Sequence, residues 1–154
     1  MSRERIESFY CAFRHRDAAG MSACYHDDAR FSDPVFPDLD AGGVRAMWSM
    51  LLSGAKDLRI EFGGIDADAQ QGRAHWDAWY TFSATGRPVR NHVETRFEFR
   101  DGLILVQRDA FDFHRWATQA LGLTGRLLGG TAFLQRKLQA QAAQRLAQWR
   151  QRKG

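Results

Sequence analysis

The chain contains little cysteine. It has only two cysteines, Cys11 and Cys24, in 154 residues. Both lie in helix-like patterns, so we expect no disulfide framework and predict a reducing, cytoplasmic location. The sequence also has no apolar run long enough to span a bilayer. The N-terminal residues 1–7 are mostly charged and lack the apolar core of a signal peptide.

Motifs for metal, phosphate and nucleophilic chemistry are missing as well. The histidines at positions 15, 26, 75, 92 and 114 are scattered, and no H-E-x-x-H or C-x-x-C motif accompanies them. The glycine-rich stretch 129–130 lacks the lysine and serine of a phosphate loop. The sequence also lacks the G-x-S-x-G motif that would indicate a serine hydrolase. We therefore predict no metal and no cofactor.

Acidic residues are absent from the C-terminal part of the chain. Residues 114–154 hold eight Lys and Arg and no Asp or Glu, so all 18 acidic residues lie in residues 1–113, beside 14 basic ones. The net charge of +4 therefore arises from the C-terminal segment. This segregation favours either an acidic partner for the segment or its docking onto the acidic body of the protein.

Three helices are predicted in the N-terminal part of a chain whose 44% hydrophobic content is typical of one packed domain. The first spans residues 2–16 with Ser2 as its cap, the second begins at residue 17 and ends at 24 or 25, and the third ends at Gly54. Apolar residues at helical spacing, which we interpret as core, are Ile6, Phe9, Tyr10 and Phe13 in the first helix and Val44, Met47, Trp48 and Leu51 in the third.

After Lys56 the hydrophobic period changes from 3.6 to 2. Four strands are predicted, around residues 58–62, 75–82, 91–99 and 103–113, and Arg100-Asp101-Gly102 is a hairpin signal. Helices followed by consecutive strands predict an α+β domain, in which a curved antiparallel sheet packs its apolar face on the helices.

Polar residues interrupt the apolar faces of the last two strands. Asn91 and Thr95 alternate with valine and phenylalanine, and such buried polar groups need a protein partner, a water or a ligand. On the last strand, Gln107 and Asp109 share a face with Phe111. An inward carboxylate is costly unless it is hydrogen-bonded or protonated. The pattern leaves open whether Asp109 is a structural or a functional residue.

The stretch from Tyr25 to Phe36 carries the strongest chemical signal. Asp33 precedes Pro34 and is flanked by Phe31 and Val35, so its surroundings are expected to be apolar. Desolvation raises the pKa of a carboxyl group and can produce a poised base. The alternative is a satisfied turn aspartate, because Asp and Pro both favour turns.

Two motifs, together with the order of helices and strands, resemble the nuclear transport factor 2-like superfamily. Its members include SnoaL-like polyketide cyclases, ketosteroid isomerase and limonene epoxide hydrolase. The motifs are residues 25–34 (YHDDARFSDP) and residues 100–112 (RDGLILVQRDAFD). The resemblance covers residues 3–113. It implies an α+β fold with a cone-shaped, curved antiparallel (mixed) sheet packed on three N-terminal helices, followed here by a C-terminal helical extension. The domain is expected to span 1–113 and the extension 114–154.

The resemblance implies roles for two aspartates. Asp33 stands where the isomerase has its proton-shuttling base, and Asp109 stands where cyclases and the epoxide hydrolase have an acid–base aspartate. The chain departs from both enzymes elsewhere. Phe9 occupies the position of the isomerase tyrosine, with Tyr10 expected on a different helix face, and Thr95 occupies that of its protonated acid. Trp76 and Ala78 occupy the arginine and second-aspartate positions of the hydrolase, so neither specific reaction is predicted.

Asp33 and Asp109 are therefore the candidate catalytic residues, in one apolar pocket beneath the sheet. Two carboxylates in one cavity push each other's pKa apart and provide an acid and a base. The predicted function is an isomerase- or cyclase-type reaction on a small apolar carbonyl compound. The alternative is a non-catalytic domain of the same fold that binds a small molecule or forms a dimer. The candidate lining residues are Phe9, Phe13, Trp48, Trp76, Tyr80, Asn91, Thr95 and Gln107.

Two surfaces are candidates for partners. The resemblance implies a homodimer through the open sheet face, which carries Trp79, His92, Glu94, Arg96 and Glu98. A last helix is predicted from Thr131, with an apolar stripe that would bury on the domain, on a partner or in a membrane interface. Binding of this basic extension to anionic lipid or nucleic acid is a third, lower-ranked hypothesis. We prefer packing of the extension on the domain.

Overall fold

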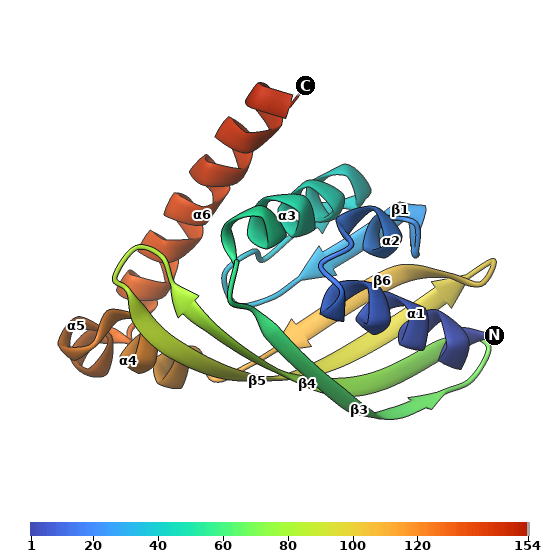
Figure 1. Cartoon of the computed structure of the whole chain (residues 1–154), viewed down its shortest axis with the longest axis horizontal. Helices are drawn as coiled ribbons and strands as arrows, with labels where there is room; N and C mark the ends of the chain where they lie inside the picture. Colours follow the sequence, from blue (N-terminus) through green and yellow to red (C-terminus); the bar gives the residue numbers. More distant parts are fainter. Residues whose placement is uncertain (154) are drawn as a thin grey trace.

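A computed structural model describes residues 1–153 of the chain. Six strands form one mixed sheet in the order β2-β1-β6-β5-β4-β3, and helices cover one face of its curve (Figure 1). The strands are β1 Tyr25–Ser32, β2 Leu39–Asp40, β3 Arg59–Ala67, β4 Gln71–Phe82, β5 Arg87–Arg100 and β6 Leu103–Ala110. The helices are α1 Ser2–Arg14, α2 Ala18–Ser22, α3 Ala41–Gly54, α4 Phe113–Leu121, α5 Leu123–Leu128 and α6 Ala132–Lys153. The predicted fold class is confirmed.

Side-chain caps set the starts of three helices. The carboxylates of Asp17, Asp40 and Asp112 accept hydrogen bonds from backbone N–H groups in the first turns of α2, α3 and α4. Ser2 lies within α1, whose N-cap is Met1, so the prediction that Ser2 caps this helix was wrong. The stripe predicted for the third helix ended with Leu51. In α3 Leu51 is 42% exposed, and the neighbouring Leu52 is buried in its place.

The sequence prediction missed two strands. Residues 25–32 form β1, which pairs in parallel with β6, and β1 pairs antiparallel with the short β2. Residues 26–28 of β1 are polar in succession, so the alternation of a strand is interrupted there, and the pairing of β1 with β6 shifts its register over the same stretch. The second helix consequently ends at Ser22. The last strand ends at Ala110 rather than at Phe113, because Asp112 caps α4 instead of continuing the ladder.

Two apolar clusters hold the molecule together. The larger one lies between α1–α3 and the concave face of the sheet, and Leu146 of α6 packs into it. The smaller one joins α4 and the start of α6 to the end of the sheet, through Trp116, Leu134 and Val89. In Figure 1, α4 and α5 lie at one end of the sheet, and α6 runs from that end past α3.

Candidate active site

Asp33 follows the last residue of β1 and closes a tight turn. Its Oδ1 accepts hydrogen bonds from the backbone N–H groups of Val35 at 2.7 Å and Phe36 at 2.6 Å. Its own N–H donates to the Phe36 carbonyl at 2.9 Å. Burial raises the pKa of Asp33 from 3.8 to about 6, although the two N–H donors lower it. Asp33 therefore caps a turn and also has a proton affinity suited to transfer near neutral pH.

Asp109 points into the core from β6. Its Oδ1 accepts hydrogen bonds from the hydroxyl of Thr95 at 2.8 Å and from Nε2 of Gln107 at 3.1 Å. Trp76 Nε1 in turn donates to the Thr95 hydroxyl at 3.0 Å. Burial raises the pKa of Asp109 from 3.8 to about 7, and the negative charge of Asp33 adds to the increase, while the two donors lower it. The two carboxyl groups are thus close enough to influence each other's protonation.

A chain of hydrogen bonds connects Asp109 to the helices. The indole N–H of Trp48 donates to the Tyr25 hydroxyl at 2.9 Å. That hydroxyl donates to Oε1 of Gln107 at 2.5 Å, and Gln107 continues to Asp109. Because Oε1 accepts from Tyr25, the amide N–H₂ of Gln107 must face the carboxylate. This series of hydrogen bonds therefore fixes the orientation of the Gln107 amide and, through it, the position of one carboxylate oxygen of Asp109.

Tyr10 brings a further hydroxyl to this cluster. Its side chain is fully buried, and its hydroxyl is the one buried side-chain polar atom among residues 1–153 without a hydrogen-bond partner. Burial raises the pKa of the phenol well above 10, and the negative charge of Asp109 contributes. Thr95 is near enough to lower this pKa, yet the two hydroxyls do not meet in hydrogen-bonding geometry. Phe9 and Tyr10 are both buried, so α1 presents two neighbouring side chains to the core.

Four predicted lining residues are aromatic side chains of the core. Ring centroids lie 6.0 Å apart for Phe9 and Trp48, 4.9 Å for Phe13 and Trp48, and 5.2 Å for Phe13 and Trp76. These contacts are typical of a packed interior. A ligand-lining role for these four residues stays a prediction.

The remaining two lining candidates lie nearer the end of the sheet. The Tyr80 hydroxyl accepts a hydrogen bond from Trp116 Nε1 at 2.8 Å. Burial raises the pKa of Tyr80, and the charge of Asp33 adds to this. Asn91 is half-buried opposite Ala78 on β4. Sequence reasoning missed Trp116 because it lies in the extension, outside the region of family resemblance.

Two surface cavities are formed along α6 rather than inside the cone. One of about 330 Å³ is lined by Val35, Phe36, Pro37, Asp38, Leu39, Gln139, Ala143, Leu146, Ala147 and Arg150. The other, of about 560 Å³, is lined by Ser22, Arg45, Ala46, Ser49, Trp149, Arg150 and Lys153. Neither is lined by Asp33, Asp109 or a predicted lining residue. The first lies directly beside the Asp33 turn.

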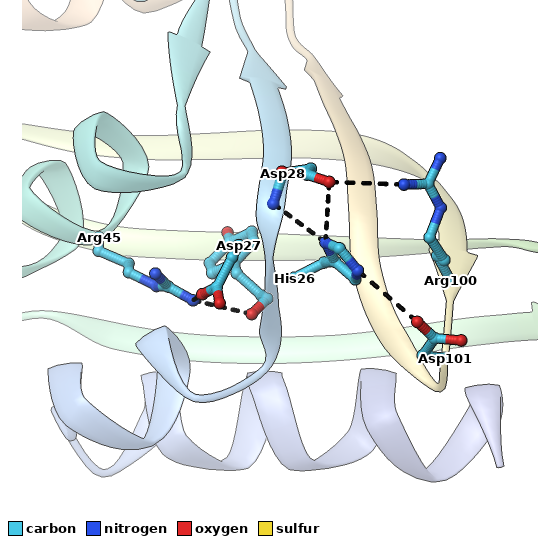
Figure 2. A network of polar contacts seen from close by, with 7 residues as sticks. His26, Asp27, Asp28, Arg45, Arg100 and Asp101 are labelled. Carbon is cyan, nitrogen blue, oxygen red and sulfur yellow. Dashed lines mark hydrogen bonds and ion pairs between the residues drawn. The ribbon is translucent and has the colours of Figure 1, made fainter.

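His26 belongs to a separate network at the other end of β1. Figure 2 shows its ring between Asp28 and Asp101, with ring nitrogens 3.9 Å and 3.7 Å from their carboxylate oxygens. Arg100 reaches the same Asp28 carboxylate at 3.5 Å. This network connects β1 to the turn between β5 and β6 through ion pairs with Arg100 and Asp101. No group of three or more His, Cys, Asp or Glu within residues 1–153 is arranged to hold a metal ion.

Comparison with known families agrees with this architecture. The family described as "SnoaL-like domain" matches residues 6–107, which include β1, the Asp33 turn and Gln107. The chain belongs to the SnoaL-like domain family. The match ends just before Asp109, and α4–α6 lie outside it. No functionally curated protein matches the sequence.

Solved structures share the fold of this SnoaL-like protein. An epoxide hydrolase from M. tuberculosis that resembles limonene epoxide hydrolase superposes with a TM-score of 0.66 at 20% identity, over 82% of this chain and 95% of that one. IdmH from Streptomyces antibioticus, a candidate polyketide cyclase, superposes with a TM-score of 0.66 at 21% sequence identity, over 80% of this chain and 99% of IdmH. TerC, co-crystallised with polyporic acid, superposes with a TM-score of 0.63 at 19% sequence identity, over 75% of this chain and 96% of TerC. At these identities the similarity shows the fold alone.

Proposed function

We propose that the protein catalyses proton transfer next to the carbonyl group of a small apolar compound, as an isomerase or cyclase does. The observation that carries the proposal is the coupled pair of carboxyl groups, Asp33 and Asp109, with pKa values of about 6 and about 7. Two groups that titrate near neutral pH in one apolar site can hold different protonation states at the same time.

The surroundings assign a role to each residue. Asp33 accepts two backbone N–H bonds, which lower its pKa and favour the ionised form, so it acts as the base. Burial and the charge of Asp33 raise the pKa of Asp109, so Asp109 holds a proton and acts as the acid. Asp33 Oδ2, which is free of the turn's N–H donors, takes a proton from the carbon beside the carbonyl. The C–H electron pair forms the C=C bond of an enol as the carbonyl oxygen takes the proton of Asp109. Where a second C=C bond is conjugated with this enol, Asp33 returns its proton to the far carbon of the conjugated system while the enol O–H gives its proton back to Asp109, so that the C=O bond re-forms and the isomerisation is complete.

Similar proteins support this reaction class. IdmH is named as a candidate polyketide cyclase, and TerC was co-crystallised with polyporic acid. Both share the fold. A small carbonyl compound that fits an apolar site is the substrate class that we propose for this protein.

The proposal is tested with an apolar ketone that has acidic α-protons, 2-tetralone, in deuterated buffer. Proton NMR follows the replacement of the α-protons by deuterium. We expect the wild-type protein to accelerate exchange, and Asp33→Asn to reduce the acceleration about 100-fold or more, because a positioned base contributes 10²–10⁴-fold. Asp109→Asn reduces it by about tenfold or more, because the enol oxygen loses its proton donor.

The matched control is Asp66→Asn. Asp66 is exposed, paired with Arg73 at 3.4 Å, and lines neither surface cavity. This variant keeps the wild-type exchange rate. Exchange that is equally fast with wild type, Asp33→Asn and Asp66→Asn contradicts the proposal.

Non-catalytic binding of a small molecule is the second candidate. It is favoured by the apolar cavity of about 330 Å³ between the Val35–Leu39 segment and α6. Chemical-shift changes of 2-tetralone on addition of the protein, without any α-proton exchange, assign this function instead.

We further propose a cytoplasmic homodimer. Both cysteines are free, as a reducing compartment requires. The dimer forms through the open face of the sheet, where Arg59 and Arg90 lie 4.2 Å and 5.1 Å from the ring of Trp79. The prediction is checked by sedimentation of the wild type and of Trp79→Ala. A monomer at all concentrations contradicts it.

A further inference from the structure

Large apolar side chains are exposed at one end of the molecule. Of the six large hydrophobic residues exposed among residues 1–153, four lie between positions 123 and 133. They are Leu123 (70% exposed), Leu127 (69%), Leu128 (40%) and Phe133 (64%). We call these four residues the α5 patch. Single exposed leucines need no explanation, but a concentration within eleven residues is informative.

The exposure follows from the way α5 packs on α4. A Cβ atom on Gly125 would overlap the carbonyl oxygen of Ala117, and one on Gly129 would lie 2.8 Å from Cδ2 of His114. The glycine side of α5 therefore faces α4. Residues two positions before and after Gly125 project from the opposite side of a helix, so Leu123 and Leu127 point away from the domain together.

The α4–α5 hairpin is held in this position. The ring of His114 is hydrogen-bonded to the Arg126 carbonyl at 2.9 Å, and Ala117 and Ala120 of α4 are fully buried. The leucines are thus presented by a packed element rather than by a loose loop. In Figure 1 the hairpin lies at the end of the sheet from which α6 departs.

The charged residues between positions 113 and 137, the segment that contains the α5 patch, are all basic; the nearest acidic residue along the chain, Asp112, caps α4. Arg115, Arg126, Arg136 and Lys137 are exposed, and none forms an ion pair with an acidic residue of the described chain. Residues 114–154 contain no Asp or Glu. Apolar side chains beside unpaired cations are the composition of segments that bind the surface of an anionic bilayer. Two copies of the patch would instead bring like charges together.

We propose that the α5 patch docks the protein on a membrane surface rich in anionic lipid. The leucines and Phe133 enter the headgroup region, and the four cations contact the lipid phosphates. The attachment is peripheral, because no helix within residues 1–153 is both long and apolar enough to cross a bilayer. This surface is independent of the proposed proton transfer at Asp33 and Asp109.

The test is flotation of the full-length protein with vesicles of phosphatidylcholine alone or with one quarter phosphatidylglycerol. We expect the protein to float with the anionic vesicles, and about 0.5 M NaCl to weaken binding, because salt screens the attraction. Leu123→Ser/Leu127→Ser reduces binding about tenfold or more, because two apolar anchors are lost. Arg126→Gln reduces it to a smaller extent.

Leu51→Ser is the matched control, since Leu51 is 42% exposed on α3, away from the patch. This variant binds the anionic vesicles like the wild type. Equal binding to both vesicle types, no binding, or unchanged binding by Leu123→Ser/Leu127→Ser overturns the proposal. A dimer that the same double variant converts to a monomer, without vesicle binding by the wild type, assigns the patch to a second copy and also overturns it.

Discussion

Thr95 and Asp109 are direct cross-strand partners on β5 and β6, and the Thr95 hydroxyl donates to Asp109 Oδ1 at 2.8 Å. One carboxylate oxygen is therefore fixed by the sheet itself. The same position lies deep enough that burial outweighs this donor and raises the pKa. The register of one hairpin thus determines both the orientation and the proton affinity of Asp109.

Asp109 makes the stability of the protein depend on pH. Its pKa is about 7 in the folded state against 3.8 for an ordinary aspartate, so the folded state holds its proton more tightly. The free energy of unfolding is therefore highest below pH 4 as far as this group is concerned, and falls as pH rises through 7. Between pH 5 and 8 we expect a loss of about 3 kcal/mol, because pH 5 lies about two units below the folded-state pKa and each unit corresponds to about 1.4 kcal/mol.

Urea unfolding of wild type and Asp109→Asn at both pH values measures this loss. The asparagine cannot ionise, so the variant loses less stability than the wild type between pH 5 and 8. Titrating groups that do not interact with Asp109 are common to both proteins and cancel in the comparison, whereas Asp33 is coupled to Asp109 and contributes to the difference. Parallel pH dependence of the two proteins contradicts a raised pKa at Asp109.

Tyr10 and Tyr25 are buried tyrosines with opposite expected effects. Tyr25→Phe leaves the Trp48 N–H and the Gln107 Oε1 without their partner and destabilises the protein by about 2 kcal/mol. Tyr10→Phe removes a hydroxyl that has no partner, so stability is unchanged or rises by up to about 1 kcal/mol. Urea unfolding of both variants is the measurement. Equal destabilisation would show that the Tyr10 hydroxyl is satisfied in solution.

Two glutamines of α6 hold the Asp33 turn. Nε2 of Gln135 and Nε2 of Gln139 both donate to the Pro34 carbonyl, at 3.1 Å and 3.0 Å. Replacing both by alanine removes both donors, and we expect a loss of about 1–2 kcal/mol and faster amide hydrogen exchange in residues 132–140.

The control for this prediction is Gln141→Ala/Gln144→Ala, which changes two exposed glutamines on the same helix. It has the same effect on helix propensity but leaves the Pro34 carbonyl paired. Similar exchange rates in the two double variants would show that the contact does not hold the helix.

The sequence predicted β3 to β6 because their apolar and polar residues alternate. It did not predict β1, whose irregular pairing with β6 and run of polar residues give no alternation. Its parallel partner lies about 80 residues away, and no local signal encodes such a pairing.

The candidate site was predictable where the family motifs reach and not beyond. Asp33 and Asp109 lie in these motifs. Alternation on the last strand left open which of its two mixed faces points inward, and the structure buries the face with Gln107 and Asp109. The orientation of Tyr10 depends on how α1 rotates against the sheet. The contact of Trp116 with Tyr80 depends on how the extension docks. Both are tertiary relationships that residue spacing does not specify.

The most direct test of the central claim is a ¹³C NMR titration of the aspartate carboxyl carbons, assigned with Asp33→Asn and Asp109→Asn. The claim predicts two resonances with apparent pKa values of about 6 and about 7. It also predicts that Asp33→Asn lowers the pKa of Asp109, because a neighbouring negative charge is removed. Two carboxyl groups that titrate independently near pH 4 would contradict a shared acid–base site.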